Sequence, residues 1–327
     1  MRRISYAQSV NEALHQLLAG DERVLLIGQG VTSPWYVGST TVGLIDQFGP
    51  ERVIDTPVSE NGVTGVAVGA ALAGMRPIVM HPRMDFMHYA MDPIANHAAN
   101  WHYMFGGQLS VPMTFWAIIN RGGEQAAQHA QALHAVFMHI PGLKVVAPST
   151  PFDAKGLLAA SVEDDNPVVF VDDRWLYERE GEVPEDLYSV PIGKAETKVE
   201  GKDVTLAASS YMVLEAIRAA EGLAKEGISA EVLDLRSLKP LDEEAVFGSV
   251  AKTGRLVVVD GGWRTCGAAA EIAALVSESL FDCLRAPIVR VTLPDAPAPA
   301  SAPLERAYYP DADVIASAAR KTMGARS

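Results

Sequence analysis

Glu60 stands at a point in the sequence where a carboxylate could do chemistry. It lies in the run DTPVSENG, between a strand-like segment that ends at Asp55 and a helical run rich in Gly and Ala. In parallel α/β sheets, ligands gather at the carboxyl ends of strands, so a carboxyl group here could exchange a proton with a bound ligand. A glutamate in the first turn of a helix is also favoured by the helix dipole alone. The local sequence leaves both interpretations open.

Histidine is concentrated in one stretch, because seven of the eight histidines lie between His81 and His139. His129, His134 and His139 are spaced five residues apart, which on a helix turns successive side chains by about 140°. This spacing argues against a shared zinc ion. His129 differs from the others because it follows a glycine-bearing loop, residues 121–128, after an expected strand. A loop at a strand end is where a catalytic imidazole is expected, so the pattern favours His129 as a catalytic residue.

Two glycine clusters could suggest a dinucleotide site, but neither has the required spacing. Residues 28–30 (GQG) follow a strand pattern, yet Ser33 stands where the third glycine is needed. The glycines of residues 62–69 lie inside a helical run, where they would let a neighbouring backbone approach closely. A nicotinamide-dependent dehydrogenase is therefore the weaker alternative.

The elements that must position these residues alternate between strand and helix patterns. The expected strands are Arg23–Ile27, Arg52–Asp55, Pro77–Met80, Met113–Ile119, Lys144–Ala147, Pro167–Val171, Asp203–Ala208, Ala230–Leu235, Leu256–Asp260 and Ile288–Thr292. The expected helices include Ser5–Leu18, Ser210–Lys225, Glu243–Lys252 and Ala268–Ser279. This alternation predicts an α/β protein with mostly parallel sheets in two three-layer α/β/α domains.

The domain boundaries follow from composition. Residues 181–202 are rich in charge, Pro and Gly and are expected to form a linker, which leaves domains at residues 1–180 and 203–327. The proline-rich tail Leu293–Glu305 is expected to be an extended surface arm.

The composition restricts the class of protein. Of the 327 residues, 49% are hydrophobic and 20% are charged, which is typical of a globular protein with a large core. A formal net charge of −13 argues against nucleic-acid binding. We find no signal peptide and no apolar run of about 20 residues, so we expect no membrane span. Cys266 and Cys283 lack metal-type spacing and fit a reducing cytoplasm.

Over nearly its whole length, the sequence resembles the β subunit of the E1 component of pyruvate and branched-chain 2-oxo-acid dehydrogenases, which is a transketolase-like family. The resemblance rests on six segments in this order: DTPVSENGVTGVAVGAALAG, FMHYAMDPIANHAA, AAQHAQ, HIPGLKVVAPSTPFDAKGLL, EDDNPVVF and VVVDGGW. It implies that the first domain is a pyrimidine-binding domain of the thiamine-diphosphate type, and that the second is a transketolase C-terminal domain.

The resemblance also implies roles for single residues. Glu60 matches the glutamate that hydrogen-bonds N1′ of the cofactor aminopyrimidine, Phe86 matches the aromatic ring that stacks on it, and His129 matches the active-site histidine. A carboxyl group at N1′ favours the imino tautomer, whose N4′ removes the C2 proton of the thiazolium ring. Further pyrimidine-contact positions match Val58, Tyr89 and Gln29. A structural potassium site in the family matches Met113, Ser161, Val162, Asp164 and Asn166.

The other half of the cofactor has no matching motif. The family holds the diphosphate through Mg²⁺ with a GDG motif and a downstream asparagine, and this sequence contains no GDG. We therefore expect an α subunit that carries the diphosphate and Mg²⁺ site, in an α₂β₂ assembly. The resemblance further implies a lipoyl-bearing E2 protein as acyl acceptor.

Three departures from the family leave the substrate open. GQG at residues 28–30 lacks the usual second acidic residue, His81–Met84 is more polar than expected, and Arg121–Glu124 adds two charges before His129. A subunit of a split transketolase or acyloin-type carboligase, with an aldehyde or sugar acceptor, is the main alternative. A third possibility is a scaffold without chemistry, against which the joint presence of Glu60, Phe86 and His129 argues.

Overall fold

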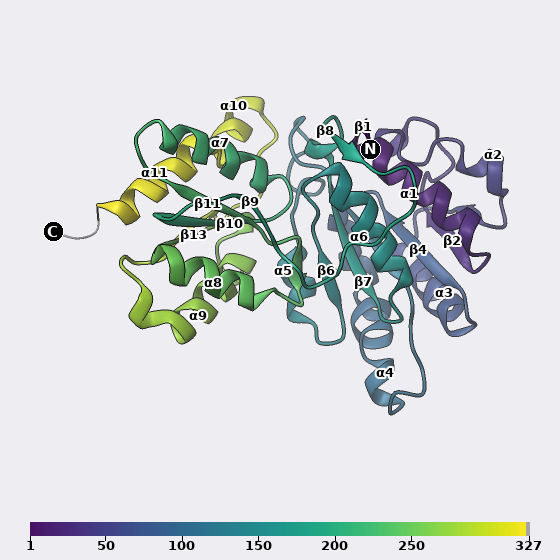
Figure 1. Cartoon of the computed structure of the whole chain (residues 1–327). Coiled ribbons are helices and arrows are strands. Elements are labelled where there is room, and N and C mark those ends of the chain that lie inside the picture. The colour runs from purple at the N-terminus through teal and green to yellow at the C-terminus, as the bar shows by residue number, and fades with distance from the viewer. Residues whose placement is uncertain (325–327) are drawn as a thin grey trace. The chain divides into compact units, whose positions relative to one another are not determined.

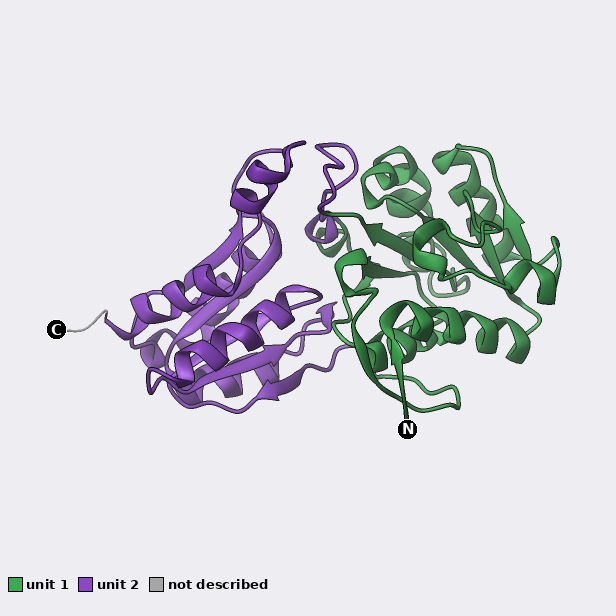
Figure 2. Ribbon diagram, turned by 90° about the horizontal axis from the view of Figure 1, so that it is seen from above, with its two compact units in different colours: residues 1–121, 137–192 green, residues 122–136, 193–327 purple. Residues whose placement is uncertain are grey.

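The computed structural model describes residues 1–324, which divide into two compact units (Figure 2). Unit 1 comprises Met1–Arg121 and Phe137–Ile192. Unit 2 comprises Gly122–Val136 and the chain from Gly193 onward. The backbone therefore passes from one unit to the other three times, and the short segment Gly122–Val136 belongs to the C-terminal unit.

Unit 1 is built on a parallel sheet whose strands run in the order β6-β7-β5-β4-β2-β3 (Figure 1). The strands are β2 (Val24–Gly28), β3 (Val53–Asp55), β4 (Arg76–His81), β5 (Thr114–Ile119), β6 (Lys144–Val146) and β7 (Val168–Asp173). Every residue of β2, β5 and β7 is buried, as expected for parallel strands covered on both faces. All six match a predicted strand.

Three long helices accompany this sheet, namely α1 (Tyr6–Gly20), α3 (Glu60–Leu72) and α6 (Pro151–Glu163). Ser5 starts α1 with a capping box, in which its hydroxyl accepts from the Gln8 amide while the Gln8 side chain accepts from the Ser5 amide. α1 packs along α6, and α3 packs on β4. The strands β1 (Arg2–Ser5) and β8 (Glu180–Val183) form a separate antiparallel pair.

Short helical segments fill the connections of the chain. They are η1 (Tyr36–Ser39), α2 (Leu44–Phe48), η2 (Met84–Ala90), η3 (Asp92–Ala98), α4 (Trp101–Met104), α5 (His134–His139), η4 (Arg174–Leu176) and η5 (Phe281–Cys283).

Unit 2 contains a five-stranded sheet in the order β14-β13-β10-β11-β9, in which only β9 runs antiparallel to its neighbour. The strands are β9 (Glu196–Val199), β10 (Val204–Ala208), β11 (Ala230–Asp234), β13 (Leu256–Trp263) and β14 (Val289–Leu293), and a short strand β12 (Ser237–Lys239) lies outside this sheet. The helices are α7 (Met212–Ala224), α8 (Glu243–Thr253), α9 (Ala268–Leu280), α10 (Ala302–Tyr308) and α11 (Ala312–Met323). The apolar faces of α7 and α11 meet the sheet in one buried core.

The predicted α/β architecture with two layered units is confirmed. The segment expected as a linker, residues 181–202, contains β9 and most of β8, and the division between the units falls inside it. The prediction of a fully extended tail was wrong for residues 302–305, which form the first half of α10. Pro303 lies in the first turn, where a helix tolerates proline because its missing N–H would have no helical partner.

Candidate functional site

The carboxyl ends of β2, β3 and β4 in unit 1 surround a small pocket. Its lining comprises Gly28, Gln29, Thr56, Pro57, Val58, Ser59, Glu60, Val63, Val79, Met80, His81 and Pro82. The pocket has a volume of about 20 Å³, which is room for roughly one water molecule. The structure thus brings Glu60, Val58 and Gln29 together, as predicted from the sequence, but the pocket is too small for an aminopyrimidine ring.

Glu60 is the first residue of α3, directly after the short loop that follows β3. Its side chain is half-buried, and its carboxylate has no hydrogen-bond or salt-bridge partner within residues 1–324. The preceding residue Ser59 does not cap the helix with its side chain. A carboxylate at a helix N-terminus that bonds to nothing in the described part of its chain is free to receive a ligand group.

The loop that carries Gln29 is held by the carboxylate of Asp55 at the end of β3. Asp55 accepts hydrogen bonds from the Gly30 amide at 2.7 Å and from the Thr32 hydroxyl at 2.8 Å. Gly30 has a φ of +74°, and a Cβ atom there would lie 2.4 Å from the Tyr36 ring. The loop after β2 therefore needs glycine at this position, which gives the GQG run a structural role other than dinucleotide binding.

Phe86 and Tyr89 lie on η2, which packs against α3. The Asn61 side-chain amide donates to the Tyr89 carbonyl at 3.2 Å and so ties the first turn of α3 to η2. Phe86 is half-buried, whereas the Tyr89 side chain is 70% exposed. Neither residue lines the pocket around Glu60, so the structure places these two predicted contacts beside that pocket rather than in it.

His81 is a pocket residue that the sequence pattern did not single out. It ends β4, is buried, and lies 3.5 Å from the Thr64 hydroxyl through Nε2. Burial lowers the pKa of His81 to about 4, so the ring is neutral at physiological pH. The polar character of the segment His81–Met84 was the signal that could have identified it.

The surface next to this pocket is apolar and exposed. Val58 and Val66 are 68% and 64% exposed. Close approach of a neighbouring element was the expected reason for the glycines of α3. Within residues 1–324 no element makes that approach at Gly65 or Gly69, because a Cβ atom there would meet no atom within 4 Å.

His129 lies in unit 2, in the segment Gly122–Val136. It is half-buried, and its amide donates to the Ala126 carbonyl at 3.4 Å. Glu124 and Ala126 adopt left-handed backbone conformations with φ of 60° and 62°, which are strained for non-glycine residues. Such strain persists only where surrounding contacts impose it, and it is common at functional loops.

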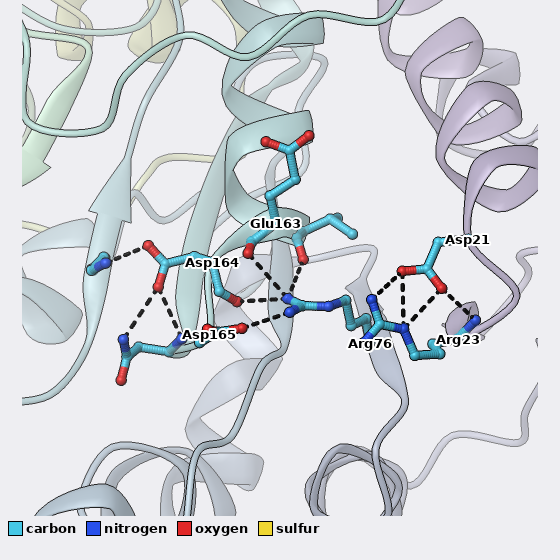
Figure 3. A network of polar contacts seen from close by, with 9 residues as sticks. Asp21, Arg23, Arg76, Glu163, Asp164 and Asp165 are labelled. Atoms are coloured by element: carbon cyan, nitrogen blue, oxygen red, sulfur yellow. Dashed lines mark hydrogen bonds and ion pairs between the residues drawn. The ribbon is translucent and has the colours of Figure 1, made fainter. Parts of the chain in front are cut away.

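Asp164, one of the residues expected to bind potassium, lies just after the C-terminal end of α6 in unit 1, where Arg76 provides a positive charge (Figure 3). The Arg76 guanidinium donates to the carbonyls of Val162 at 2.9 Å and Asp164 at 3.1 Å. The Met113 carbonyl accepts from the Val168 amide at 3.0 Å. Backbone carbonyl oxygens are suitable ligands for a potassium ion. A carbonyl oxygen that accepts one hydrogen bond still has a second lone pair.

A buried carboxyl group, Asp172, lies in β7. It accepts hydrogen bonds from Trp116 Nε1 at 2.7 Å and from the Tyr177 hydroxyl at 2.8 Å. Burial raises the pKa of Asp172 to about 7, against the lowering effect of these hydrogen bonds. Its neighbour Asp173 forms a buried salt bridge with Arg121 at 2.8 Å. The sequence pattern does not reveal this cluster, because Trp116 lies 56 residues before Asp172 and Arg121 is similarly distant from Asp173.

Metal-ligand clusters and membrane spans are absent from the described residues. No group of three or more His, Cys, Asp and Glu side chains within residues 1–324 could hold a metal ion. None of the helices in that range combines the length and apolarity needed to cross a membrane.

Comparison with known proteins gives the family. The family model of the transketolase pyrimidine-binding domain matches residues 2–179, and that of the transketolase C-terminal domain matches residues 193–315. The β subunit of acetoin:2,6-dichlorophenolindophenol oxidoreductase from Bacillus subtilis is 46% identical over 335 residues, with coverage of 99% of this chain and 98% of the relative. The protein of the same name from Cupriavidus necator is 45% identical, with 98% of each chain covered.

The β subunit of the pyruvate dehydrogenase E1 component from Rickettsia bellii is 42% identical, with 97% of this chain and 98% of the relative covered. A solved structure of a split-gene transketolase, described as an inactive β4 tetramer, has a TM-score of 0.80 and covers 99% of each chain. At 23% identity it shows similarity of fold alone. The chain therefore belongs to the transketolase-like family of β subunits of 2-oxo-acid dehydrogenase E1 components.

Proposed function

We propose that this chain is the β subunit of a thiamine-diphosphate-dependent enzyme of the E1 type, in which Glu60 activates the cofactor. The observation that carries the proposal is the unpartnered carboxylate of Glu60 in a pocket at the carboxyl ends of parallel strands. In family members this position faces N1′ of the aminopyrimidine. When bound, thiamine diphosphate supplies the carbanion and electron sink for cleavage of a bond next to a carbonyl group.

The residues of this chain would orient and switch on that cofactor. Glu60 would hold a proton at N1′, and Phe86 would keep the pyrimidine ring flat by stacking. Val58, Gln29 and Tyr89 would complete the contacts of the ring. His129 would meet the substrate and move a proton or orient the acceptor.

A second chain is part of the proposal. Glu60 is only half-buried, the pocket holds about one water, and apolar residues beside it are exposed. We infer that an α subunit covers this surface, excludes water from Glu60, and anchors the diphosphate and Mg²⁺ in an α₂β₂ assembly. Residues 1–180 would act as the pyrimidine-binding domain and residues 203–327 as the transketolase C-terminal domain, with residues 181–202 between them.

Two substrates are candidates for this enzyme. A 2-oxo acid with a lipoyl-bearing E2 acceptor is the first. Acetoin is the second, because the two relatives named after it are 46% and 45% identical, against 42% for the pyruvate dehydrogenase relative. Cleavage of acetoin releases acetaldehyde where decarboxylation of pyruvate releases CO₂, and both break a bond beside a carbonyl group. Two free, exposed cysteines support a reducing cytoplasmic location.

The experiment is to co-express the chain with an α subunit of the same family that carries the GDG motif. The purified complex is supplied with thiamine diphosphate and Mg²⁺, and dichlorophenolindophenol reduction is measured with acetoin, pyruvate and branched-chain 2-oxo acids in parallel. We expect activity with one substrate class in the complex and none with either chain alone. Full turnover by this chain without a partner would refute the shared-cofactor proposal.

Potassium binding is a separate, minor part of the proposal. We infer that the carbonyls of Met113, Ser161, Val162, Asp164 and Asn166 hold the ion beside Arg76. At equal ionic strength, KCl should then raise the thermal midpoint of the complex above its value in NaCl. Equal midpoints in the two salts would remove the potassium assignment.

A further inference from the structure

The segment Gly122–Val136, which carries His129, is fastened to unit 2 on both sides of that histidine. It contacts α10 through Glu124 before His129, and it contacts β13 through His134 after it. The side chain between these contacts that is buried deepest, Ala130, packs with Leu293, Ala298 and Tyr308 in a small apolar cluster. All of these residues lie in unit 2.

The contact with β13 is a buried charged hydrogen bond. His134 Nε2 lies 2.8 Å from Asp260 Oδ1, and the exposed fractions of the two side chains are 6% and 4%. Because a carboxylate accepts, the His134 ring carries its proton on Nε2. Asp260 Oδ1 also accepts from the Gly262 amide at 2.8 Å, and Oδ2 accepts from the Ala269 amide at 3.2 Å in the first turn of α9.

The electrostatics of Asp260 match this geometry. Burial alone would raise the pKa of the Asp260 carboxyl, but the His134 ring and the hydrogen bonds from His134, Gly262 and Ala269 together lower it below its ordinary value. The carboxylate is therefore a fixed, ionised acceptor that joins the end of β13, the start of α9 and the His129 segment.

The contact with α10 is reciprocal. The Glu124 amide donates to Glu305 Oε1 at 3.0 Å, and Glu124 Oε1 accepts from the Ala302 amide at 3.1 Å, at the first residue of α10. Glu124 thus takes the place of a capping side chain, which Ser301 does not provide. Glu124 makes both bonds from a left-handed backbone conformation with φ of 60°.

We propose that His134 and Asp260 are positioning residues that hold His129 on the C-terminal unit in its catalytic geometry, with Glu124 as the second anchor. The role for His129 rests on the proposed function. The anchoring itself does not, since it concerns how tightly the segment Gly122–Val136 is held. Loss of the His134–Asp260 bond should leave Glu60 and the pyrimidine contacts intact while His129 becomes mobile.

The first test measures the segment itself by hydrogen exchange of peptides from residues 122–136 in the full chain. His134→Ala should speed exchange there by about tenfold or more, because a buried bond to a charged group is lost. His134→Gln keeps a donor for Asp260 and should restore most of the protection. The control is His102→Ala, which removes an exposed histidine that bonds the Leu109 carbonyl in unit 1.

Glu124→Ala provides a second variant that does not open the core, because Glu124 is exposed. It should speed exchange in the same peptides by a smaller factor. Unchanged exchange in both His134→Ala and Glu124→Ala would overturn the proposed anchoring.

The second test uses the assembled enzyme. His134→Ala should lower kcat by about tenfold or more with little change in the thiamine diphosphate concentration for half-maximal activity, and His134→Gln should recover it. Faster exchange with an unchanged kcat would overturn the positioning role. A wild-type complex without thiamine-dependent activity would instead overturn the proposed function, while the exchange experiment would still decide the anchoring.

Discussion

Glu60 in unit 1 is the first residue of the helix α3, and Asp260 in unit 2 lies in the strand β13 and accepts from the first turn of the helix α9. Asp260 is buried and accepts three hydrogen bonds, from one side chain and two amides. Glu60 is half-buried and bonds to nothing within residues 1–324. A carboxylate at the boundary between strand and helix is thus a structural acceptor in unit 2, and in unit 1 it has no partner within residues 1–324. What separates them is whether the chain itself satisfies the carboxylate.

The largest expected effect is the loss of activity on replacement of Glu60. Glu60→Gln should lower kcat of the assembled enzyme by about a thousandfold, because an amide cannot exchange a proton with N1′. The thermal midpoint should stay near that of the wild type. The matched control is Glu51→Gln, which alters an exposed carboxylate in the turn before β3. Activity within a factor of about two of the wild type would show that Glu60 is only a helix-start residue.

Replacement of Asp260, whose carboxylate accepts three hydrogen bonds, should lower stability rather than activity alone. Asp260→Ala leaves His134 and the amides of Gly262 and Ala269 without their acceptor, so we expect a loss of about 2–4 kcal/mol in the free energy of unfolding. Glu60→Ala should change the same quantity by less than about 0.5 kcal/mol. Denaturant unfolding of the full-length variants measures both, and equal losses would erase the contrast between the two carboxylates.

Asp172 extends the comparison to a buried carboxyl group whose hydrogen-bond donors, Trp116 and Tyr177, are uncharged. Its pKa is raised to about 7, so between about pH 4 and pH 7 the folded chain holds a proton that the unfolded chain has released. Stability should therefore fall with rising pH in this window, by at most about 1.4 kcal/mol per pH unit. Asp172→Asn should flatten that slope, as measured by denaturant unfolding at several pH values. An unchanged slope would assign the pH dependence to other groups.

The smallest effect is expected at the aromatic ring next to the Glu60 pocket. Phe86→Ala should raise the thiamine diphosphate concentration for half-maximal activity by about fivefold to tenfold, because a stacking partner is lost. Phe86→Leu is expected to have an intermediate effect, and Tyr89→Phe, which keeps its ring, to have little. If Phe86→Ala binds the cofactor as the wild type does, the pyrimidine is held by other residues.

The elements of the sheets could be predicted from the sequence because buried parallel strands are short apolar runs between helical patterns. The place of Glu60 between a strand and a helix could be predicted for the same reason, whereas its role was predicted only from the resemblance to the family. The His134–Asp260 bond could not, because its partners are 126 residues apart and neither has a local signature. The histidine spacing raised His134 only as a possible metal ligand, and that spacing assumes one continuous helix.

Long-range contacts also explain the error at α10. The segment Leu293–Glu305, which includes the first half of α10, is rich in proline, and local propensity favours an extended arm. The helix begins at Ala302 because a carboxylate from a distant segment, that of Glu124, satisfies its first amide. Likewise, the incomplete pocket around Glu60 cannot be read from one chain, since what closes it is proposed to lie in another.

The excursion of residues 122–136 into unit 2 limits how this protein can be divided. A fragment that ended at Ile192 would contain all the strands from β2 to β7, yet it would carry the His129 segment without α10, β13 or α9 to receive it. The two units are therefore not interchangeable modules. A recombination event that separated the chain at residue 192 would keep the strands of unit 1. It would separate His129 from the elements of unit 2 that hold its segment.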